Sequence, residues 1–158
     1  MLGFPRVINE KAARTVAAVV ALTGLIALAT GAHWLLIPLA YGFWARVLTG
    51  PRLSPLAQLA SKVIAPRLGE PNDVAGPPKR FAQGMGAAIT TLGVVALALG
   101  WSTVTAVLLA MLIVAATLEA ALGLCIGCKV FAGLMRAGIV PETVCVECAD
   151  ISSRLQRA

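Results

Sequence analysis

Runs of apolar residues alternate along the chain with shorter polar or proline-rich stretches. The longest apolar runs cover residues 15–32, 34–48, 81–100 and 103–124. A helix needs about 17–25 residues to cross the ~30 Å hydrocarbon core of a bilayer, and the first, third and fourth runs meet that length. The second run is shorter and contains Pro38. The pattern predicts an all-α integral membrane protein: a four-helix bundle of two hairpins, with a cytoplasmic interfacial helix and a C-terminal cytoplasmic helical hairpin.

The composition supports lipid as the solvent of this chain. Hydrophobic residues make up 59% of the 158 residues and charged residues 13%, whereas an ordinary globular domain is about half apolar and a quarter charged. The length suits one domain. We therefore expect a single membrane domain over residues 1–158 that has the lipid bilayer as its first partner.

The positions of the basic residues predict how the chain is oriented. All 13 Lys and Arg residues lie before the first run, from the end of the second to the start of the third, or after the fourth. Basic residues in short flanking segments mark the cytoplasmic face of a membrane. We expect both termini, the loop 49–80 and the segment 125–158 on that face. A nucleic-acid-binding surface needs a clustered basic stripe, so no nucleic acid is expected.

The cytoplasmic loop contains one predicted helix, in the stretch SPLAQLASKVIAPRL. Ser54 is a suitable N-cap, and Pro55 is suited to the first helical position. Lys62 and Arg67 lie off the apolar face. Either a membrane interface or the cytoplasmic ends of the bundle can cover that face. Its residues are Leu56, Leu59, Ala60, Val63 and Ile64.

Glu119 is an acidic residue inside the fourth apolar run. An ionised carboxylate is costly at membrane depth and is normally paired or functional. The sequence favours an ion pair over a proton-handling role. The basic residues placed at the same end of the bundle are Arg14, Arg46 and Arg80.

Two CxxC motifs follow the fourth run, and sixteen residues separate Cys125 and Cys128 from Cys145 and Cys148. This spacing is typical of zinc sites, so the four cysteines are candidate metal ligands. Zinc requires all four sulfurs to lie within about 4 Å of one another. Because the cytoplasm is reducing, a permanent structural disulfide is not expected, and exchangeable thiols are the other interpretation.

Local structure favours thiol chemistry over zinc. We expect the fourth helix to continue over residues 125–137, to stop at Gly138, and to be followed by a second helix from Pro141 or Thr143. A regular hairpin brings only Cys128 and Cys148 to the same height. The four sulfurs can meet only if the helix breaks near Gly127 or Gly133.

The expected helix ends predict different roles for the two motifs. Cys145 and Cys148 lie in the first turns of a helix, where the dipole favours a thiolate, whereas the first motif lies near the far end of one. We therefore expect Cys145 to attack, Cys148 to resolve, and these two to form the easiest disulfide. Cys125 and Cys128 would be the pair at the membrane edge that exchanges electrons or sulfur.

The segments FPRVINEKAAR, GPPKRFAQGMGA and LGLCIGCKVFAGLMRAGIVPETVCVEC resemble a family of small bacterial four-span membrane proteins labelled only as a domain of unknown function. The most specific feature is the double CxxC, with Arg136, Gly138 and Pro141 between the pairs. The resemblance implies a multi-pass protein of the bacterial cytoplasmic (inner) membrane. It also implies thioredoxin-like or rhodanese-type sulfurtransferase partners.

These observations predict a membrane-embedded thiol-relay or sulfur-carrier protein. One alternative is a structural protein or complex subunit whose C-terminal segment binds zinc through the four cysteines. A small transporter is a further alternative, although transporters usually contain internal repeats and broken helices, and no matching motif occurs in the two hairpins. An oligomer or a larger complex is compatible with the sequence.

Overall fold

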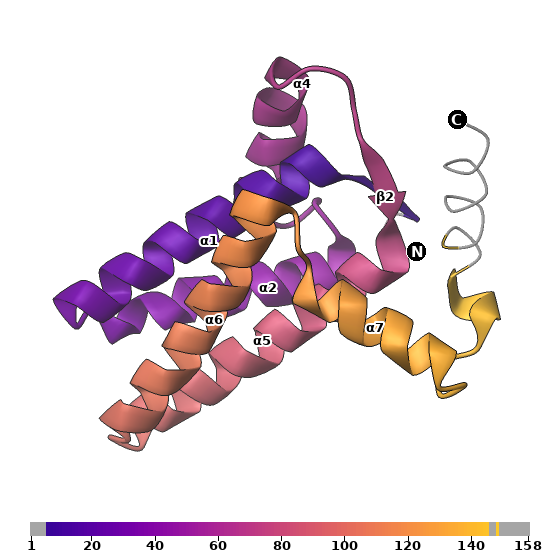
Figure 1. Ribbon diagram of the computed structural model, residues 1–158. Helices are drawn as coiled ribbons and strands as arrows, with labels where there is room; N and C mark the ends of the chain where they lie inside the picture. Colours follow the sequence, from indigo (N-terminus) through magenta and orange to yellow (C-terminus); the bar gives the residue numbers. More distant parts are fainter. Residues whose placement is uncertain (1–5, 146–147, 149–158) are drawn as a thin grey trace.

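The computed structural model describes residues 6–145 and Cys148. Four helices form a bundle (Figure 1): α1 (Glu10–Thr30), α2 (Leu36–Thr49), α5 (Gly76–Ala98) and α6 (Ser102–Leu122). Helix α1 packs on α6, α2 packs on α5, and α5 packs on α6. The predicted helical class is confirmed.

Three of these helices are long and apolar enough to cross a membrane, namely α1, α5 and α6. They correspond to the first, third and fourth apolar runs. Helix α2 has 14 residues, which is below the length of about 17 that a spanning helix needs. The 3₁₀ turn His33–Leu35 directly precedes it. Length and composition therefore support three membrane-crossing helices.

The sequence sets the helix ends through caps and glycines. The Asn9 side chain accepts a hydrogen bond from the backbone N–H of Lys11 at 3.0 Å and caps α1, as expected for an asparagine in this position. Gly31 and Gly100 adopt positive φ angles of 71° and 75°, after the end of α1 and before the start of α6. Helix α5 begins at Gly76, earlier than expected, because Pro77 and Pro78 fit a first helical turn.

A short antiparallel sheet modifies the all-α prediction. Strand β1 (Val7–Asn9) pairs with β2 (Asp73–Ala75). The backbone N–H of Glu10 donates to the Asn72 carbonyl at 2.7 Å, and the Asn72 amide contacts the Glu10 carboxylate. These contacts join the start of α1 to the start of α5.

The helix predicted in the loop is present, as α3 (Pro55–Leu59), a π-helical turn (Ala60–Ile64) and α4 (Ala65–Arg67). Ser54 accepts from the Ala57 N–H at 3.4 Å, as predicted for an N-cap. Part of the predicted apolar stripe packs on the bundle, because Ala60 is buried and Leu56 and Ile64 are half-buried. Ala57 and Ala65 complete the buried face, whereas Leu59, Lys62 and Val63 are exposed.

The prediction of a continuous helix through residue 137 was wrong. Helix α6 ends at Leu122, where Gly123 adopts a φ of 67° and its N–H donates to the Glu119 carbonyl. The chain then starts a new helix, α7 (Ile126–Arg136), which extends away from the bundle (Figure 1). Gly138, with a φ of 74°, ends α7 as expected.

Beyond α7 the chain forms a 3₁₀ turn, Glu142–Cys145. The second helix of the C-terminal hairpin, which was expected to begin at Pro141 or Thr143, thus begins as a 3₁₀ turn. Apart from Cys148, the rest of it lies outside the described residues.

Candidate functional site

The first CxxC motif lies at the N-terminus of α7. Cys125 is the N-cap residue, and its sulfur accepts a hydrogen bond from the Cys128 backbone N–H at 3.3 Å. A helix N-terminus presents unpaired N–H groups and a positive dipole end, so a thiolate is favoured there. This is the reverse of the predicted arrangement, in which the first motif lay near the far end of a helix.

The pKa values of the two thiols of this motif are shifted in opposite directions. The pKa of Cys125 is lowered, mainly because the Cys128 thiol donates a hydrogen bond to it. The positive charge of Lys79 also lowers this pKa, whereas burial and the charge of Glu119 raise it. The pKa of Cys128 is raised, because Cys128 donates its proton in the hydrogen bond to Cys125 and because it is partly buried. Cys125 is therefore the more acidic thiol of the pair, and Cys128 is the thiol that donates to it.

A buried ion pair lies beside the cysteines. The Lys79 Nζ donates to Glu119 Oε1 at 2.6 Å, and the two side chains are 7% and 15% exposed. Glu119 thus forms the predicted ion pair, but Lys79 is its partner instead of Arg14, Arg46 or Arg80.

The three arginines have other partners. Arg14 donates to the Ala120 and Ala121 carbonyls at 3.1 and 2.9 Å, which satisfies two carbonyls at the end of α6. Arg46 Nε donates to Gln83 Oε1 at 2.8 Å. Arg80 Nε donates to the Val47 carbonyl at 3.1 Å.

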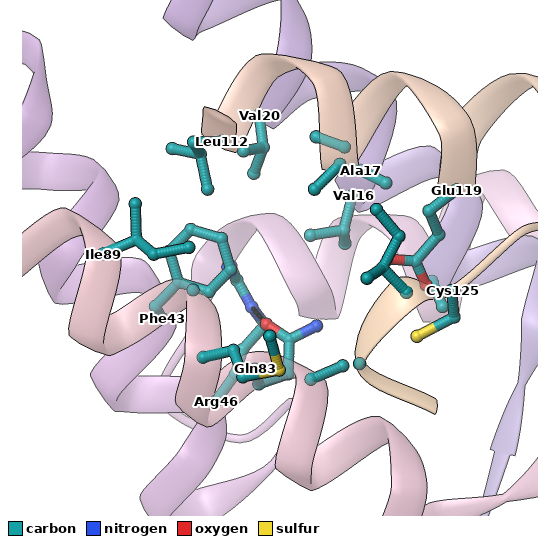
Figure 2. A pocket seen from close by; sticks show the side chains of 18 residues that line it. Val16, Ala17, Val20, Phe43, Arg46, Gln83, Ile89, Leu112, Glu119 and Cys125 are labelled. Carbon is teal, nitrogen blue, oxygen red and sulfur yellow. Dashed lines mark hydrogen bonds between the residues drawn. The ribbon is translucent and has the colours of Figure 1, made fainter. Parts of the chain in front are cut away.

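Cys125 lines two cavities, an outer one and an inner one. The outer one, about 330 Å³, is lined by both cysteines of the first motif and by Lys79. The inner one, about 90 Å³, lies within the bundle. Figure 2 shows Cys125 and Glu119 on one side of the inner cavity, with Arg46 and Gln83 across from them. Cys125 is thus buried at the bundle, while the half-buried Cys128 opens to the outer pocket.

A close backbone contact fixes the position of this site. A Cβ at Gly127 would lie 2.5 Å from the Cα and Cβ of Ala82, so only glycine allows α7 to approach α5 this closely. Phe131 of α7 also packs on Phe81 of α5, with ring centroids 5.7 Å apart. These contacts hold the N-terminus of α7 against the first turns of α5, where Lys79 is located.

The second CxxC motif is oxidised. Cys145 and Cys148 form a disulfide with a Cα–Cα distance of 5.3 Å, which is the bridge predicted as the easiest. Cys125 and Cys128 are free thiols. Val144, next to this disulfide, shares a pocket with Pro77 and Phe81. The first turns of α5 therefore adjoin both motifs.

The four cysteines do not converge on a metal site. Within residues 6–145 and Cys148, no group of three or more His, Cys, Asp and Glu side chains is placed to hold a metal ion. The chain bends at Gly123, not at Gly127 or Gly133, and this bend separates α7 from α6 without bringing the two pairs together. The described residues thus do not fit the tetrahedral sulfur cage that zinc needs.

A family model described as "Domain of unknown function (DUF4395)" matches residues 8–136. The chain belongs to this family. The segment matched by DUF4395 includes Cys125 and Cys128 and ends before Cys145 and Cys148. Comparisons with curated proteins and with solved structures gave no match.

Sequence reasoning missed the role of Lys79 and Gln83. Both lie on α5 near its start. Lys79 precedes residue 81, where the helix was expected to begin. The signal was present in the Gly76-Pro77-Pro78 run, since prolines are favoured in the first turn of a helix. It would have placed Lys79 on the helix and at the level of Glu119.

Proposed function

We propose that this protein is a four-span protein of the bacterial cytoplasmic membrane and that its Cys125–Cys128 pair passes electron pairs to disulfides at the cytoplasmic face. The observation that carries the proposal is the free Cys125 sulfur at the N-cap of α7, hydrogen-bonded to the backbone N–H of Cys128. A thiolate in that position is a nucleophile, and its neighbour can complete a disulfide.

The packing of α2 supports a fourth membrane segment. Leu36 lies against Gly93, Phe43 lies against Gly86, and the Trp44 indole donates to Thr91 at 3.0 Å, so α2 follows α5 along its length. If α5 crosses the bilayer, α2 lies beside it at the same depth. The outward stripe of α2 is apolar or aromatic, as a lipid-facing surface requires: Ile37, Tyr41, Trp44 and Leu48.

The proposed reaction is a two-step exchange. The Cys125 thiolate attacks one sulfur of an acceptor disulfide, a mixed disulfide forms, and the other acceptor sulfur leaves as a thiolate. Cys128 then loses its proton to that thiolate and attacks the Cys125 sulfur. The second acceptor sulfur leaves as a thiolate. The acceptor gains two electrons, and Cys125 and Cys128 are oxidised to a disulfide.

The electrostatics of the pair set the order of these steps. The charge and hydrogen bond of Cys125 are main causes of the raised pKa of Cys128. Both effects end once the Cys125 sulfur is in a mixed disulfide, because it is then neutral. The pKa of Cys128 therefore falls after the first step, and Cys128 becomes the nucleophile of the second.

Two acceptors fit this scheme. One is the Cys145–Cys148 disulfide of the same chain, which the first turns of α5 separate from Cys125. The other is the disulfide of a thioredoxin-like protein in the cytoplasm. In the first case the segment around Val144 must move across α5, and in the second the outer pocket is the docking point.

Trapping of the mixed disulfide tests the roles of the two thiols. The full chain, purified in detergent and reduced, is treated with glutathione disulfide and analysed by mass spectrometry. We expect Cys128→Ser to accumulate glutathione on Cys125, and the wild-type protein to carry little, because Cys128 displaces the glutathione and forms the Cys125–Cys128 disulfide. A variant with Cys145→Ser and Cys148→Ser is the control. Glutathione that accumulates as much on the wild-type protein as on Cys128→Ser, or that is found on Cys128 of the wild-type protein, would contradict the proposal.

A sulfur carrier would use the same thiolate in another reaction. A rhodanese-type donor would transfer a sulfane sulfur to Cys125, leaving a persulfide on it. The two functions differ in their product. A sulfur carrier has a persulfide on Cys125 and a free thiol on Cys128, whereas electron transfer leaves a disulfide between Cys125 and Cys128. The same experiment with a persulfide donor, followed by alkylation, separates them.

A further inference from the structure

A further cavity, of about 210 Å³, has no cysteine in its lining. It is enclosed by β1 and the start of α1, the end of α2, the helical segment after Ser54 and the start of α5. Its polar lining includes Arg46, Lys79, Gln83 and Asn9, and much of the rest is apolar. No Asp or Glu lines it among the residues that the structure describes.

Arg46 is buried in this cavity wall with unused donors. It is 6% exposed, its Nε donates to Gln83, and its guanidinium lies 4.6 Å from the centroid of the Phe43 ring. Within the described part of the chain, its two Nη groups have no hydrogen-bond or ion-pair partner. No buried side-chain nitrogen or oxygen there lacks a partner, so the Nη groups reach open space. Arg46 lines the inner cavity and this one.

The amide side chains also present donors. Asn9 Oδ1 accepts from the Lys11 N–H, and Gln83 Oε1 accepts from Arg46 Nε. Each oxygen already accepts one hydrogen bond, whereas the NH₂ groups of both amides have no hydrogen-bond partner among residues 6–145 and Cys148 and can donate to a ligand. Arg46, Lys79 and the two amides therefore supply N–H donors to the cavity, and Ser61 adds a hydroxyl.

The buried charges near this cavity do not balance. Arg46 and Lys79 are each 6% exposed. Glu119 acts electrostatically on both, but it forms its ion pair with Lys79. One positive charge is left without a carboxylate within ion-pair distance, and an uncompensated buried charge is costly. A bound anion would offset that cost.

We propose that this cavity binds a phosphate-class oxyanion, supplied either as free phosphate or as the headgroup of an anionic phospholipid. The donors come from different sides, because Arg46 lies on α2, Lys79 and Gln83 on α5, and Asn9 before α1. Such a set suits a tetrahedral anion, and a guanidinium can bind it in a bidentate manner. Both sources share this phosphate chemistry.

Thermal unfolding of the delipidated full chain in detergent tests the site. Circular dichroism follows unfolding with inorganic phosphate, with phosphatidylglycerol in the micelles, or with chloride at equal ionic strength. Ligand that binds the folded state raises Tm. We expect Arg46→Gln to lose the Tm shift and to weaken the apparent Kd about tenfold or more, because charge-assisted hydrogen bonds are removed.

A cavity-filling variant keeps the test decisive if Arg46→Gln does not fold. Ser61 lines the cavity, and its hydroxyl bonds only the helix carbonyls of Ala57 and Gln58. Ser61→Met should therefore fold and lose the shift. Lys62→Gln, at the neighbouring exposed position, should keep it.

The outcomes also identify the source of the anion. A shift with phosphate alone assigns free phosphate, and a shift with phosphatidylglycerol alone assigns a lipid headgroup. The proposal is overturned if neither ligand raises Tm, or if Ser61→Met shifts as much as the wild-type protein.

Discussion

Lys79 and Glu119 form an ion pair of 2.6 Å that joins the first turns of α5 to the last turn of α6. The pair does more than connect two helices, because the charge of Lys79 also acts on Cys125 and Cys128. It thus links the packing of the bundle to the chemistry of the first CxxC motif.

Removing either member of the ion pair should destabilise the protein strongly. Lys79→Met leaves Glu119 buried without its partner, and such a change typically costs about 3–5 kcal/mol in the free energy of unfolding. The double variant Lys79→Met/Glu119→Leu removes both charges and should recover most of that loss. Unfolding of the four proteins of this double-mutant cycle in detergent measures the coupling.

Lys62→Met is the matched control, because Lys62 is exposed. This substitution should change the free energy of unfolding by no more than about 0.5 kcal/mol. Additive effects of the two single variants would show that the ion pair does not stabilise the fold.

The two thiols of the first motif should differ in the pH dependence of alkylation. A lowered pKa keeps Cys125 ionised at pH values where an ordinary thiol is protonated, so its reaction with iodoacetamide should level off at lower pH. The raised pKa of Cys128 delays its reaction to higher pH. Burial slows Cys125 overall, so the shape of each profile is the quantity to compare, by mass spectrometry of the alkylated peptides.

The donor responsible for this shift can be removed. Cys128→Ala deletes the side chain that donates to Cys125, so the Cys125 profile should move to higher pH. Lys129→Gln, at an exposed position on the same helix, serves as the control and should leave it almost unchanged. A Cys125 profile identical in wild type and Cys128→Ala would refute the assignment.

The helices of the bundle could be predicted because their signals are local. Apolar runs gave α1, α5 and α6, and Ser54 marked the start of the loop helix. Each signal depends on a few neighbouring residues and on burial in lipid or core. The disulfide between Cys145 and Cys148 was predictable in the same way, from their spacing.

The site could not be predicted in full because it depends on one backbone break. The sequence around Gly123 is apolar on both sides, so periodicity alone gave a continuous helix. Cysteine is also not among the preferred N-cap residues, so nothing marked Cys125 as the start of α7. Once the break is placed at Gly123, Cys125 moves from a helix end to a helix start, and the expected acidities change with it. The predicted partner of Glu119 was wrong because α5 starts earlier than expected and therefore includes Lys79.

Labelling should show whether the membrane topology is as proposed. In a version with all four cysteines replaced by serine, Ala32→Cys and Ser102→Cys lie at the two turns opposite the basic segments. An impermeant maleimide should label both in intact cells. Asp73→Cys, in the basic loop, should react only after lysis. If the maleimide labelled Asp73→Cys in intact cells, the loop would lie outside the cytoplasm and the proposed topology would be wrong.

The close contact between α7 and α5 offers a sharper test of how the site is held. A Cβ at Gly127 would lie 2.5 Å from two Ala82 atoms and 3.2 Å from the Ala82 backbone nitrogen, so α7 must move away from α5. Gly127→Ala should cost about 1–3 kcal/mol, as overpacked sites do.

The same displacement should change the chemistry of the site. As α7 moves, Cys125 becomes less buried and moves away from the Lys79–Glu119 ion pair. Burial and the charge of Glu119 raise the pKa of Cys125 more than the charge of Lys79 lowers it, so its alkylation profile should shift to lower pH. Gly133→Ala is the matched control on the same helix, because a Cβ there meets nothing within 4 Å. It should stabilise α7 by about 0.5–1 kcal/mol through the loss of glycine flexibility and leave the Cys125 profile unchanged. If Gly127→Ala behaved like Gly133→Ala in both measurements, the packing of α7 on α5 would not be what positions the Cys125 thiolate.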